Sequence, residues 1–277
     1  MTDFREASPR ADVGVFGGSG FYAFLDDARE VRVSTEWGTP SGPVMLGTLS
    51  RLRVAFIPRH GRSHEHPAHR VDYRANVAAM RALGVRSLIA PFAAGSLQPG
   101  LRPGDFVVVD QLVDRTQGRV DTFHDHFADG PQHVSLADPY DSALREVLLE
   151  ATRAEGVRTH DGGTVVVING PRFSTRAESR WFSRTGWDLV NMTQYPEAAL
   201  AREAGLAYAG LALVTDYDAG LEGDASVEAV SQERVFEMFE ANLDRLRAVL
   251  ARSVGLLAER DATRPTPALR PTAVPAG

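Results

Sequence analysis

A buried strand that ends in two carboxylates is the feature that most constrains this chain. Leu211 to Thr215 form an apolar run of strand length, and Asp216 and Asp218 follow it at once. Burying an acid without a partner is costly, so a strand that delivers two acids to its end suits a polar site better than a core. The sequence therefore predicts a ligand site at this strand end.

Short apolar runs alternate with longer amphipathic segments along the chain. Strands are predicted at Val13–Phe16, Val54–Ile57, Leu88–Pro91, Phe106–Asp110, Thr164–Asn169 and Leu211–Thr215, and helices at Asp72–Leu83, Ser142–Glu155, Thr175–Arg184, Glu197–Ala204 and Gln232–Ala258. Strands interleaved with helices indicate an α/β fold with a largely parallel central sheet. We expect a flexible N-terminus over residues 1–11, one domain over residues 12–259 and a disordered tail rich in proline and alanine over residues 260–277.

Composition and charge argue against several classes of protein. The net charge is -6 and no long basic stretch is present, which argues against nucleic acid as a partner. The chain has no run of about 18 apolar residues that could cross a membrane, and its polar start lacks the apolar segment of a signal peptide, so we expect a cytoplasmic protein. The absence of cysteine excludes disulfides, thiolate nucleophiles and cysteine-ligated zinc. The polar stretch 113–135 is predicted to be a functional loop.

Two motifs at strand ends have features of an anion site. Gly17-Gly-Ser-Gly20 follows the first strand, where glycines permit close backbone approach and the hydroxyl of Ser19 suits an anion. A plain tight turn explains the same residues. Arg59 and His60 follow the second strand; a guanidinium matches the oxygens of phosphate and the imidazole could add a donor. A surface charge is the alternative interpretation of Arg59.

Two further motifs lie at a strand end and at a helix start, where a ligand could bind. The small residues of Phe92-Ala-Ala-Gly-Ser96 permit close backbone contact, although simple packing explains them as well. Thr193 precedes a helix whose N-terminus favours an anion, and Met192 could offer an apolar surface to a sugar ring. Ligands bind at the carboxyl ends of strands in open α/β sheets. Together the five motifs predict a site with an anion at one end and an amine or ring nitrogen at the other.

A histidine cluster supports a rival hypothesis. His60, His64, His66 and His69 are four of the eight histidines, and His124 and His126 form a further pair. Neutral imidazoles with two acids could bind a metal ion, as in a metal-dependent hydrolase or deaminase. However, His64 lies well past the second strand and Pro67 breaks any helix that could align the others. Solvated loop histidines are the commoner explanation.

The motifs in their order resemble one family, the 5′-methylthioadenosine phosphorylases of the trimeric branch of the purine nucleoside phosphorylases. The resemblance covers about residues 12–250 and rests on Gly17-Gly-Ser-Gly20, Arg59-His-Gly-Arg-Ser-His64, Ala93-Ala-Gly-Ser-Leu97, Gly170-Pro-Arg-Phe-Ser-Thr-Arg-Ala-Glu178, Asn191-Met-Thr-x-x-Pro-Glu197 and Thr215-Asp-Tyr-Asp218. It implies a mixed, partly barrel-like sheet, a homotrimer, no metal or other cofactor, and inorganic phosphate as co-substrate. The implied reaction is phosphorolysis of 5′-methylthioadenosine, or of a related 5′-substituted adenosine, to adenine and a pentose 1-phosphate, a step of purine and methionine salvage.

The resemblance also implies roles for individual residues. Phosphate would be bound by Ser19, Arg59, His60, Phe92, Ala93 and Thr193. The nucleoside would be bound by Phe173, Met192, Asp216, Tyr217, Asp218, Val235 and Phe236, and by His133 reaching from a neighbouring subunit. Asp216 would protonate N7 of the purine and Asp218 would face its 6-amino group, although the residue that carries the proton stays open. Ser174 and Gln232 fall where the family tunes specificity.

Two departures from the family pattern bear on the substrate. Phe92 stands where the family often has Thr, which removes a hydroxyl donor for phosphate. Gln232 replaces an apolar residue near the 5′ group and could change the preferred 5′ substituent. Two acids in Asp216-Tyr-Asp218 favour adenine over 6-oxopurines. The alternatives are a purine nucleoside phosphorylase of broader or 6-oxopurine specificity, the metal-dependent enzyme and a nucleoside-binding protein without catalysis.

Overall fold

The computed structural model describes residues 9–17, 25–127, 130–220 and 227–262. Three expectations fall wholly or partly beyond these ranges. Ser19, most of the predicted N-terminal segment and residues 263–277 of the predicted tail lie outside the described residues.

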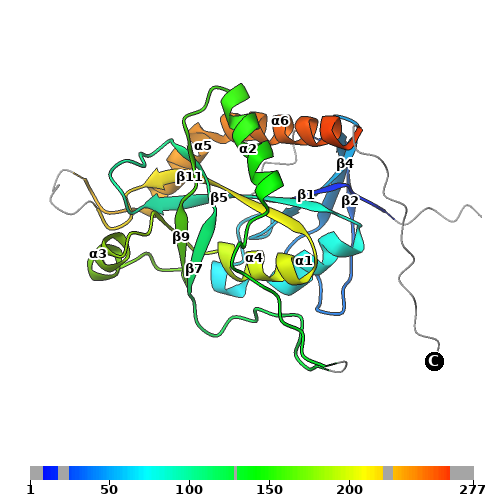
Figure 1. Ribbon diagram of the computed structural model, residues 1–277, viewed down its shortest axis with the longest axis horizontal. Helices are drawn as coiled ribbons and strands as arrows, with labels where there is room; N and C mark the ends of the chain where they lie inside the picture. The colour runs from blue at the N-terminus through cyan, green and yellow to red at the C-terminus, as the bar shows by residue number, and fades with distance from the viewer. Residues whose placement is uncertain (1–8, 18–24, 128–129, 221–226, 263–277) are drawn as a thin grey trace, which may run out of the picture.

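The described strands form one mixed sheet with β5 at its centre (Figure 1). The strands are β1 (Val13–Gly17), β2 (Asp26–Val31), β3 (Val44–Leu49), β4 (Leu52–Pro58), β5 (Ser87–Ser96), β6 (Phe106–Val108), β7 (Gln111–Arg115), β8 (Thr159–Asp161), β9 (Thr164–Ile168), β10 (Leu189–Asn191) and β11 (Ala207–Asp216). Their order is β2-β3-β4-β1-β5-β10-β9-β7, and β5 also pairs with β11, which is followed by β6 and β8. Six pairings are parallel and four are antiparallel among these strands, which confirms the predicted mixed, largely parallel sheet.

The two edges of β5 are covered differently. On one edge β11 runs parallel to β5 along its whole length. On the other edge β1 covers only the start of β5, as far as Ile89, and β10 begins only at Gly95. The backbone between these two residues therefore has no strand partner on that edge, and it is free to meet other groups.

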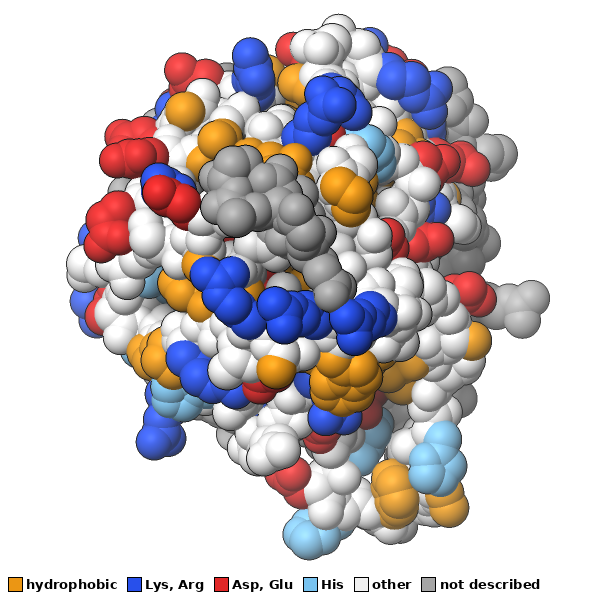
Figure 2. All heavy atoms as spheres, turned by 90° about the vertical axis from the view of Figure 1, so that its left-hand side faces the viewer, with side chains coloured by type: hydrophobic (Ala, Val, Ile, Leu, Met, Phe, Trp, Pro, Cys, Tyr) orange, Lys and Arg blue, Asp and Glu red, His pale blue; other side chains and the backbone are white. Residues whose placement is uncertain are grey.

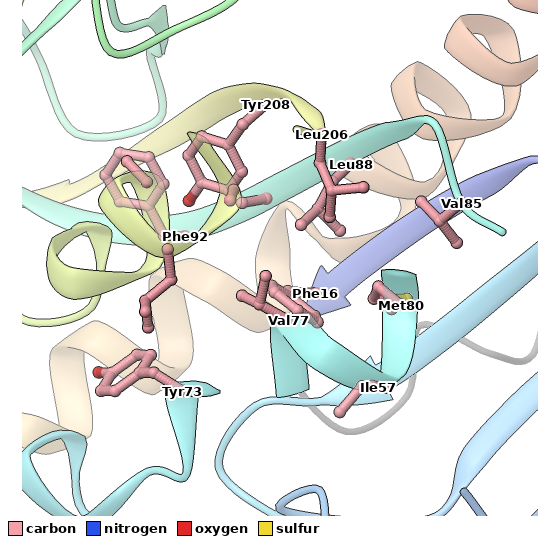
Figure 3. Close-up of a cluster of buried hydrophobic side chains, with 14 of the residues drawn as sticks. Phe16, Ile57, Tyr73, Val77, Met80, Val85, Leu88, Phe92, Leu206 and Tyr208 are labelled. Carbon is pink, nitrogen blue, oxygen red and sulfur yellow. The ribbon is translucent and has the colours of Figure 1, made fainter. Parts of the chain in front are cut away.

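Helices cover both faces of the sheet, as Figure 1 shows. They are α1 (Tyr73–Ala82), α2 (Ser142–Ala154), α3 (Arg176–Arg184), α4 (Gln194–Glu203), α5 (Gln232–Ala241) and α6 (Leu243–Ala262), with a short 3-10 helix η2 (Ala68–Arg70). Side chains alternate along β5, so Leu88 joins a core cluster with residues of α1 and α4, whereas Ile89 joins a cluster with residues of α2 and α6. Figure 3 shows part of the first cluster, where Tyr73, Val77 and Met80 of α1 pack toward the sheet.

The structure has strands that the sequence pattern did not predict. These are β2, β3, β7, β8 and β10. β2 lies at the edge of the sheet and has a polar sequence, so it lacks the apolar run of a buried strand. β8 and β10 are three residues long, too short for a periodic pattern. β7 takes up the start of the predicted loop 113–135, and the described remainder of that loop has no regular structure.

The single C-terminal helix predicted over Gln232–Ala258 is wrong in two respects. It is divided at Asn242, whose ψ of 4° is not helical and whose side-chain amide donates to the carbonyl of Met238 at 2.9 Å. The second part, α6, continues to Ala262, past the expected end of the domain, and Arg260 binds Glu150 there at 2.9 Å. None of the helices in the described residues is long and apolar enough to cross a membrane.

Candidate active site

A β-bulge at the end of β11 turns Asp216 toward the centre of the sheet. Val214 pairs with Ala94, but the next residue of β5, Gly95, pairs with Asp216, so Thr215 is the extra residue. The carboxylate needs the absence of a side chain opposite, because a Cβ on Gly95 would lie 2.9 Å from Asp216 Oδ1 and 3.2 Å from the Cβ of Asp218. Gly95 thus permits two acids to approach one strand.

Asp216 is held in place by its neighbours. Its Oδ1 accepts from the N–H of Asp218 at 2.7 Å and its Oδ2 accepts from the hydroxyl of Thr215 at 2.7 Å. Burial raises the pKa of Asp216, while these two hydrogen bonds oppose the rise. The side chain is therefore fixed in orientation, and it is also easier to protonate than an exposed acid.

Asp218 is the more deeply buried acid. It is 2% exposed and adopts a left-handed backbone, with φ of 47°, which an aspartate tolerates. Burial raises its pKa; hydroxyls of Ser179 and Ser174 oppose the rise, and the nearby charge of Asp216 adds to it. Asp218 Oδ2 and Ser174 Oγ nevertheless have no hydrogen bond of good geometry in the described residues. A ligand bearing an N–H group would satisfy the carboxyl oxygen.

The loop before α3 brings Phe173 and Ser174 to this pair of acids. Thr175 caps the helix by accepting from the N–H of Glu178, whose carboxylate in turn accepts from the N–H of Thr175. The cap fixes the direction in which the chain enters α3, and Phe173, directly before Ser174, is 37% exposed. The buried Ser179, one turn into the helix, faces Asp218, a role that its place in an amphipathic pattern did not reveal.

Arg59, directly after β4, forms a buried ion pair with Glu197. Its Nε and Nη2 donate to the two carboxylate oxygens of Glu197 at 2.6 and 2.8 Å, and Tyr208 donates to the same carboxylate at 2.7 Å. Burial works to lower the pKa of Arg59, but the adjacent carboxylate outweighs burial and raises the pKa above its ordinary value. The guanidinium stays charged and rigid, and it keeps N–H groups on Nη1 and Nη2 for a ligand.

His60 has a defined tautomer. Its Nδ1 lies 2.8 Å from the carbonyl oxygen of His66, which can only accept, so Nδ1 carries a proton. Burial and the charge of Arg59 lower the pKa of His60 to about 4, so the ring is neutral at physiological pH. The expectation that His60 adds a donor is therefore wrong for the neutral ring. Its free Nε2 accepts a hydrogen bond, as from the P–OH group of hydrogen phosphate.

The uncovered edge of β5 lies beside these residues. The carbonyl of Pro91 accepts from Arg59 Nη1 at 3.4 Å, and that of Ala93 accepts from the side chain of Asn191 at 3.0 Å. Successive residues direct their N–H groups to opposite edges, so the N–H of Ala93 faces this gap and that of Phe92 faces β11. The ring of Phe92 is buried in the core (Figure 3). The prediction that Phe92 binds phosphate is therefore corrected: the N–H of Ala93, and not that of Phe92, faces the gap on this edge.

Thr193 contributes less than its position before α4 suggests. Its N–H and that of Gln194 both donate to Asn191 Oδ1, at 2.6 and 2.8 Å, so these two N–H groups of the helix start are occupied. Asn191 holds both this turn and the carbonyl of Ala93. The hydroxyl of Thr193 lies 3.3 Å from the same oxygen, a long contact that a ligand can replace.

Met192 and α5 form the remaining walls of the site. The sulfur of Met192 lies against Gly170, where a Cβ would come within 2.6 Å of it. From α5, the ring of Phe236 packs edge-on against His64 at 5.8 Å, and His64 stacks on His60 at 4.4 Å. Through these ring contacts Phe236, predicted to line the 5′ pocket, is connected to His60, predicted to bind phosphate. Val235 is half-buried on the same helix, whereas Gln232, its first residue, is exposed.

His133 is the predicted site residue that one chain does not bring to the site. It is exposed on the segment after β7, and its ring contacts that of Phe127 at 5.7 Å. Phe127, Val120, Val134 and Leu136 are exposed hydrophobic residues on the same segment, which is therefore suited to contact another molecule.

The electrostatic surroundings favour an anion. The chain contains no lysine, so the row of basic side chains in Figure 2, on the end of the molecule that carries α3, consists of arginines. Arg172, Arg176, Arg180 and Arg184 are exposed there. Arg172 is paired with Glu178 at 2.8 Å, and the exposed arginines attract anions to this end of the molecule although the net charge is -6. In the described part of the chain, no three histidines or acids gather where they could hold a metal ion.

We predict that Glu197→Ala lowers the free energy of unfolding by about 3–5 kcal/mol, because it leaves the charge of Arg59 buried without a partner. Urea unfolding measures the loss. The control is Glu150→Gln, which breaks the exposed pair with Arg260 and is expected to cost less than about 1 kcal/mol. Equal losses in the two variants would contradict the importance of the buried pair.

We predict that Asp218→Asn stabilises the folded protein at neutral pH. A carboxyl whose pKa is raised on folding costs nothing at low pH, where it is protonated in both states, and costs progressively more as the pH rises through the raised value. Asparagine also tolerates the left-handed backbone. Urea unfolding at pH 7.5 and 4.5 should show a gain that shrinks at the lower pH. A pH-independent gain would refute this origin, and the variant Asp138→Asn, at an exposed acid, is the control.

Known proteins are similar to this chain along most of its length. A model of the phosphorylase superfamily matches residues 12–255. The chain is 52% identical over 261 residues to a purine nucleoside phosphorylase of Streptomyces coelicolor, with 91% of this chain and 92% of that protein covered. It is 57% identical over 232 residues to an S-methyl-5′-thioadenosine phosphorylase of Mycolicibacterium smegmatis, with 83% and 85% covered.

Solved structures are similar in fold and in sequence. A methylthioadenosine phosphorylase from Schistosoma mansoni in complex with adenine has a TM-score of 0.85 and 37% identity, covering 92% of this chain and 94% of that one. A methylthioadenosine phosphorylase from an antarctic soil metagenomic library has a TM-score of 0.84 and 41% identity, covering 91% and 88%. The chain therefore belongs to the phosphorylase superfamily, in the family of the methylthioadenosine and purine nucleoside phosphorylases.

Proposed function

We propose that the protein catalyses phosphorolysis of 5′-methylthioadenosine, or of an adenosine with a related 5′ substituent, to adenine and a pentose 1-phosphate. One observation carries the proposal. Asp216 and Asp218 lie against Gly95, two residues along β5 from the uncovered backbone at Ala93 and four from Pro91, whose carbonyl accepts from Arg59. Two residues of a strand span about 7 Å, a separation that suits a purine at one end and a phosphate attacking C1′ at the other.

The phosphate end combines one cation with neutral groups. Arg59 supplies N–H groups to the phosphate oxygens, the N–H of Ala93 and the hydroxyl of Thr193 add further donors, and His60 Nε2 accepts the P–OH. Because Glu197 offsets the charge of Arg59, hydrogen phosphate is bound largely through directed hydrogen bonds rather than through net charge. Ser19 is assigned to the same ligand on the family resemblance alone.

The acidic end serves the leaving group. As a phosphate oxygen attacks C1′, the C1′–N9 bond breaks and negative charge develops on the purine. Asp216 is assigned to N7 as the general acid and Asp218 to the 6-amino group, and burial favours a proton on this pair. The proton belongs to the coupled carboxyls rather than to one of them. Hydrogen phosphate loses one proton when it forms the ester and adenine gains one proton, so the reaction balances.

The sugar and its 5′ group fall between the two ends. Met192 would lie against the ribose and Phe173 against the purine, with Tyr217 and Ser174 beside the base. Val235 and Phe236 of α5 would line the 5′ pocket, and Gln232 would tune it. A homotrimer would complete this pocket with His133 of a neighbouring subunit, which agrees with the exposure of His133 and of the hydrophobic residues around it.

A purine nucleoside phosphorylase of broader specificity is the second candidate. The name of the S. coelicolor relative and the polar, exposed Gln232 favour it. Against 6-oxopurines, an ionised Asp218 would accept from a 6-amino group but would face the lone pairs of a 6-oxo group. The base preference therefore follows from this carboxyl, and the 5′ preference from α5.

A phosphate-dependent assay with methylthioadenosine, adenosine and inosine side by side tests the function. We expect adenine release that requires phosphate, resists chelators and is faster with methylthioadenosine than with the other two. Comparable use of inosine would favour the broader phosphorylase. Chelator-sensitive release without phosphate would indicate the metal-dependent hydrolase, and binding without turnover would indicate a nucleoside-binding protein.

We predict that Asp216→Asn lowers turnover of methylthioadenosine by about 10²–10⁴, the usual effect of losing a general acid. Asparagine keeps the size of the side chain but cannot supply a proton to N7. The rate constant at saturating phosphate and nucleoside is the measurement, and Asp138→Asn, an exposed acid, is the matched control. Undiminished turnover in the Asp216 variant would rule out its assignment as the acid.

A further inference from the structure

Arg119 binds an unusual number of backbone carbonyls. It is half-buried on the segment after β7, close to the base of that segment. Its Nη2 donates to the carbonyls of Met192 at 2.8 Å and Asn169 at 3.0 Å, and more weakly to that of Ile168 at 3.4 Å. Its Nη1 donates to the carbonyl of Tyr195. One side chain thus ties together the turn after β10 and the turn after β9.

These bonds occupy the guanidinium completely. Its Nε approaches Asn169 Oδ1 at 3.4 Å, Nη1 also reaches the hydroxyl of Tyr73 at 3.4 Å, and the group lies over the ring of Tyr73 at 5.5 Å. A guanidinium has five N–H groups, and all are used by these acceptors. Arg119 is therefore not available as an anion ligand, and its contribution must act through the loops that it holds.

The two loops carry the walls of the nucleoside cleft. Met192 itself is on one of them, and Phe173 follows Asn169 and Gly170 on the other. Gly170 meets the sulfur of Met192 with no room for a Cβ between them, so the loops touch directly. The same segment of chain is fastened to α4 by Asp121, which accepts from the hydroxyl of Tyr195 at 2.6 Å, and by Thr122, which donates to Glu203 at 2.8 Å.

We propose that Arg119 is a positioning residue for the nucleoside, setting the distance between the Met192 and Phe173 walls by bridging their backbones. The inference rests on the proposed function, because it takes these two residues as the contacts of ribose and purine. Lysine cannot replace arginine here, since its N–H groups radiate from one atom and cannot span carbonyls of two loops. Of the residues assigned to phosphate, Arg59 and Ala93 are held by other side chains, Glu197 and Asn191. Thr193 lies between Met192 and Tyr195, whose carbonyls Arg119 binds.

The test compares Arg119→Lys and Arg119→Met with the wild-type chain in steady-state kinetics and calorimetric binding. Misplaced walls should raise the KM for methylthioadenosine and the dissociation constant of adenine by about 10–100-fold. The KM for phosphate should rise several-fold less, because Arg59 and Ala93 are held by Glu197 and Asn191 and only Thr193 lies on a turn that Arg119 binds. A residue of merely structural importance would not separate the two substrates in this way.

Arg145→Lys is the matched control. Arg145 of α2 also donates to two carbonyls, those of Val109 at 3.0 Å and Val108 at 3.1 Å, and it binds Asp161, but it is remote from the site. We expect this variant to lower the melting temperature without separating the two KM values. The proposal is overturned if Arg119→Lys behaves like the control, or if both KM values rise together.

The outcomes distinguish this inference from the proposed function. If the wild-type chain shows no phosphorolysis, the proposed function fails, whereas adenine binding by calorimetry still reports on Arg119. If the wild-type chain is active and Arg119→Lys binds adenine as tightly, the proposed function stands and the inference fails. If Arg119→Met does not fold, Arg119→Lys, which retains the charge and most of the volume, provides the answer.

Discussion

The site depends on one irregularity of the sheet, which is that β5 changes neighbours along one edge. β1 leaves it at Ile89 and β10 joins it only at Gly95, so the strand keeps full pairing with β11 while its other edge is open in between. A buried backbone without a strand partner must find other hydrogen bonds. Arg59 and Asn191 supply them to the carbonyls, and each belongs to a segment with a role at the site. The side chains that satisfy the open edge of β5 are therefore also parts of the candidate site.

Charge is distributed so that the two ends of the site differ. At the end that we assign to phosphate, the guanidinium of Arg59 is paired with Glu197, and burial and the same guanidinium favour the neutral form of His60. At the other end, two carboxyls lie in a buried setting that disfavours their ionisation. The free protein avoids a large uncompensated charge, and Asp218 Oδ2, a buried oxygen without a hydrogen bond in the described residues, belongs to the end that we assign to the purine.

The sequence pattern allowed the main elements, and the position of Asp216 and Arg59 at strand ends, to be predicted, because these residues follow apolar runs that are strands. The chemistry assigned to the two ends stays a prediction. The bulge at Thr215 was not predictable, since it depends on how β11 registers against β5. The direction of the N–H of Ala93, the tautomer of His60 and the occupied N–H of Thr193 depend on neighbours distant in sequence or on turn geometry. Arg119 and Ser179 lie in segments without periodicity or on an ordinary helix face, so only tertiary contacts reveal them.

The break at Asn242 separates two helices that differ in how deeply they are buried. α6 is anchored in the core through Leu246, Val249 and Leu250, whereas α5 has no buried residue among those described. Apart from Phe239, which packs against the core, we expect substitutions in α5 to leave the packing of the sheet intact and to leave Asp216 and Arg59 in place. The part of the substrate that we assign to α5 can therefore diverge between relatives while the bond that is broken stays the same. Such an arrangement allows relatives to share one reaction while they are named for different substrates.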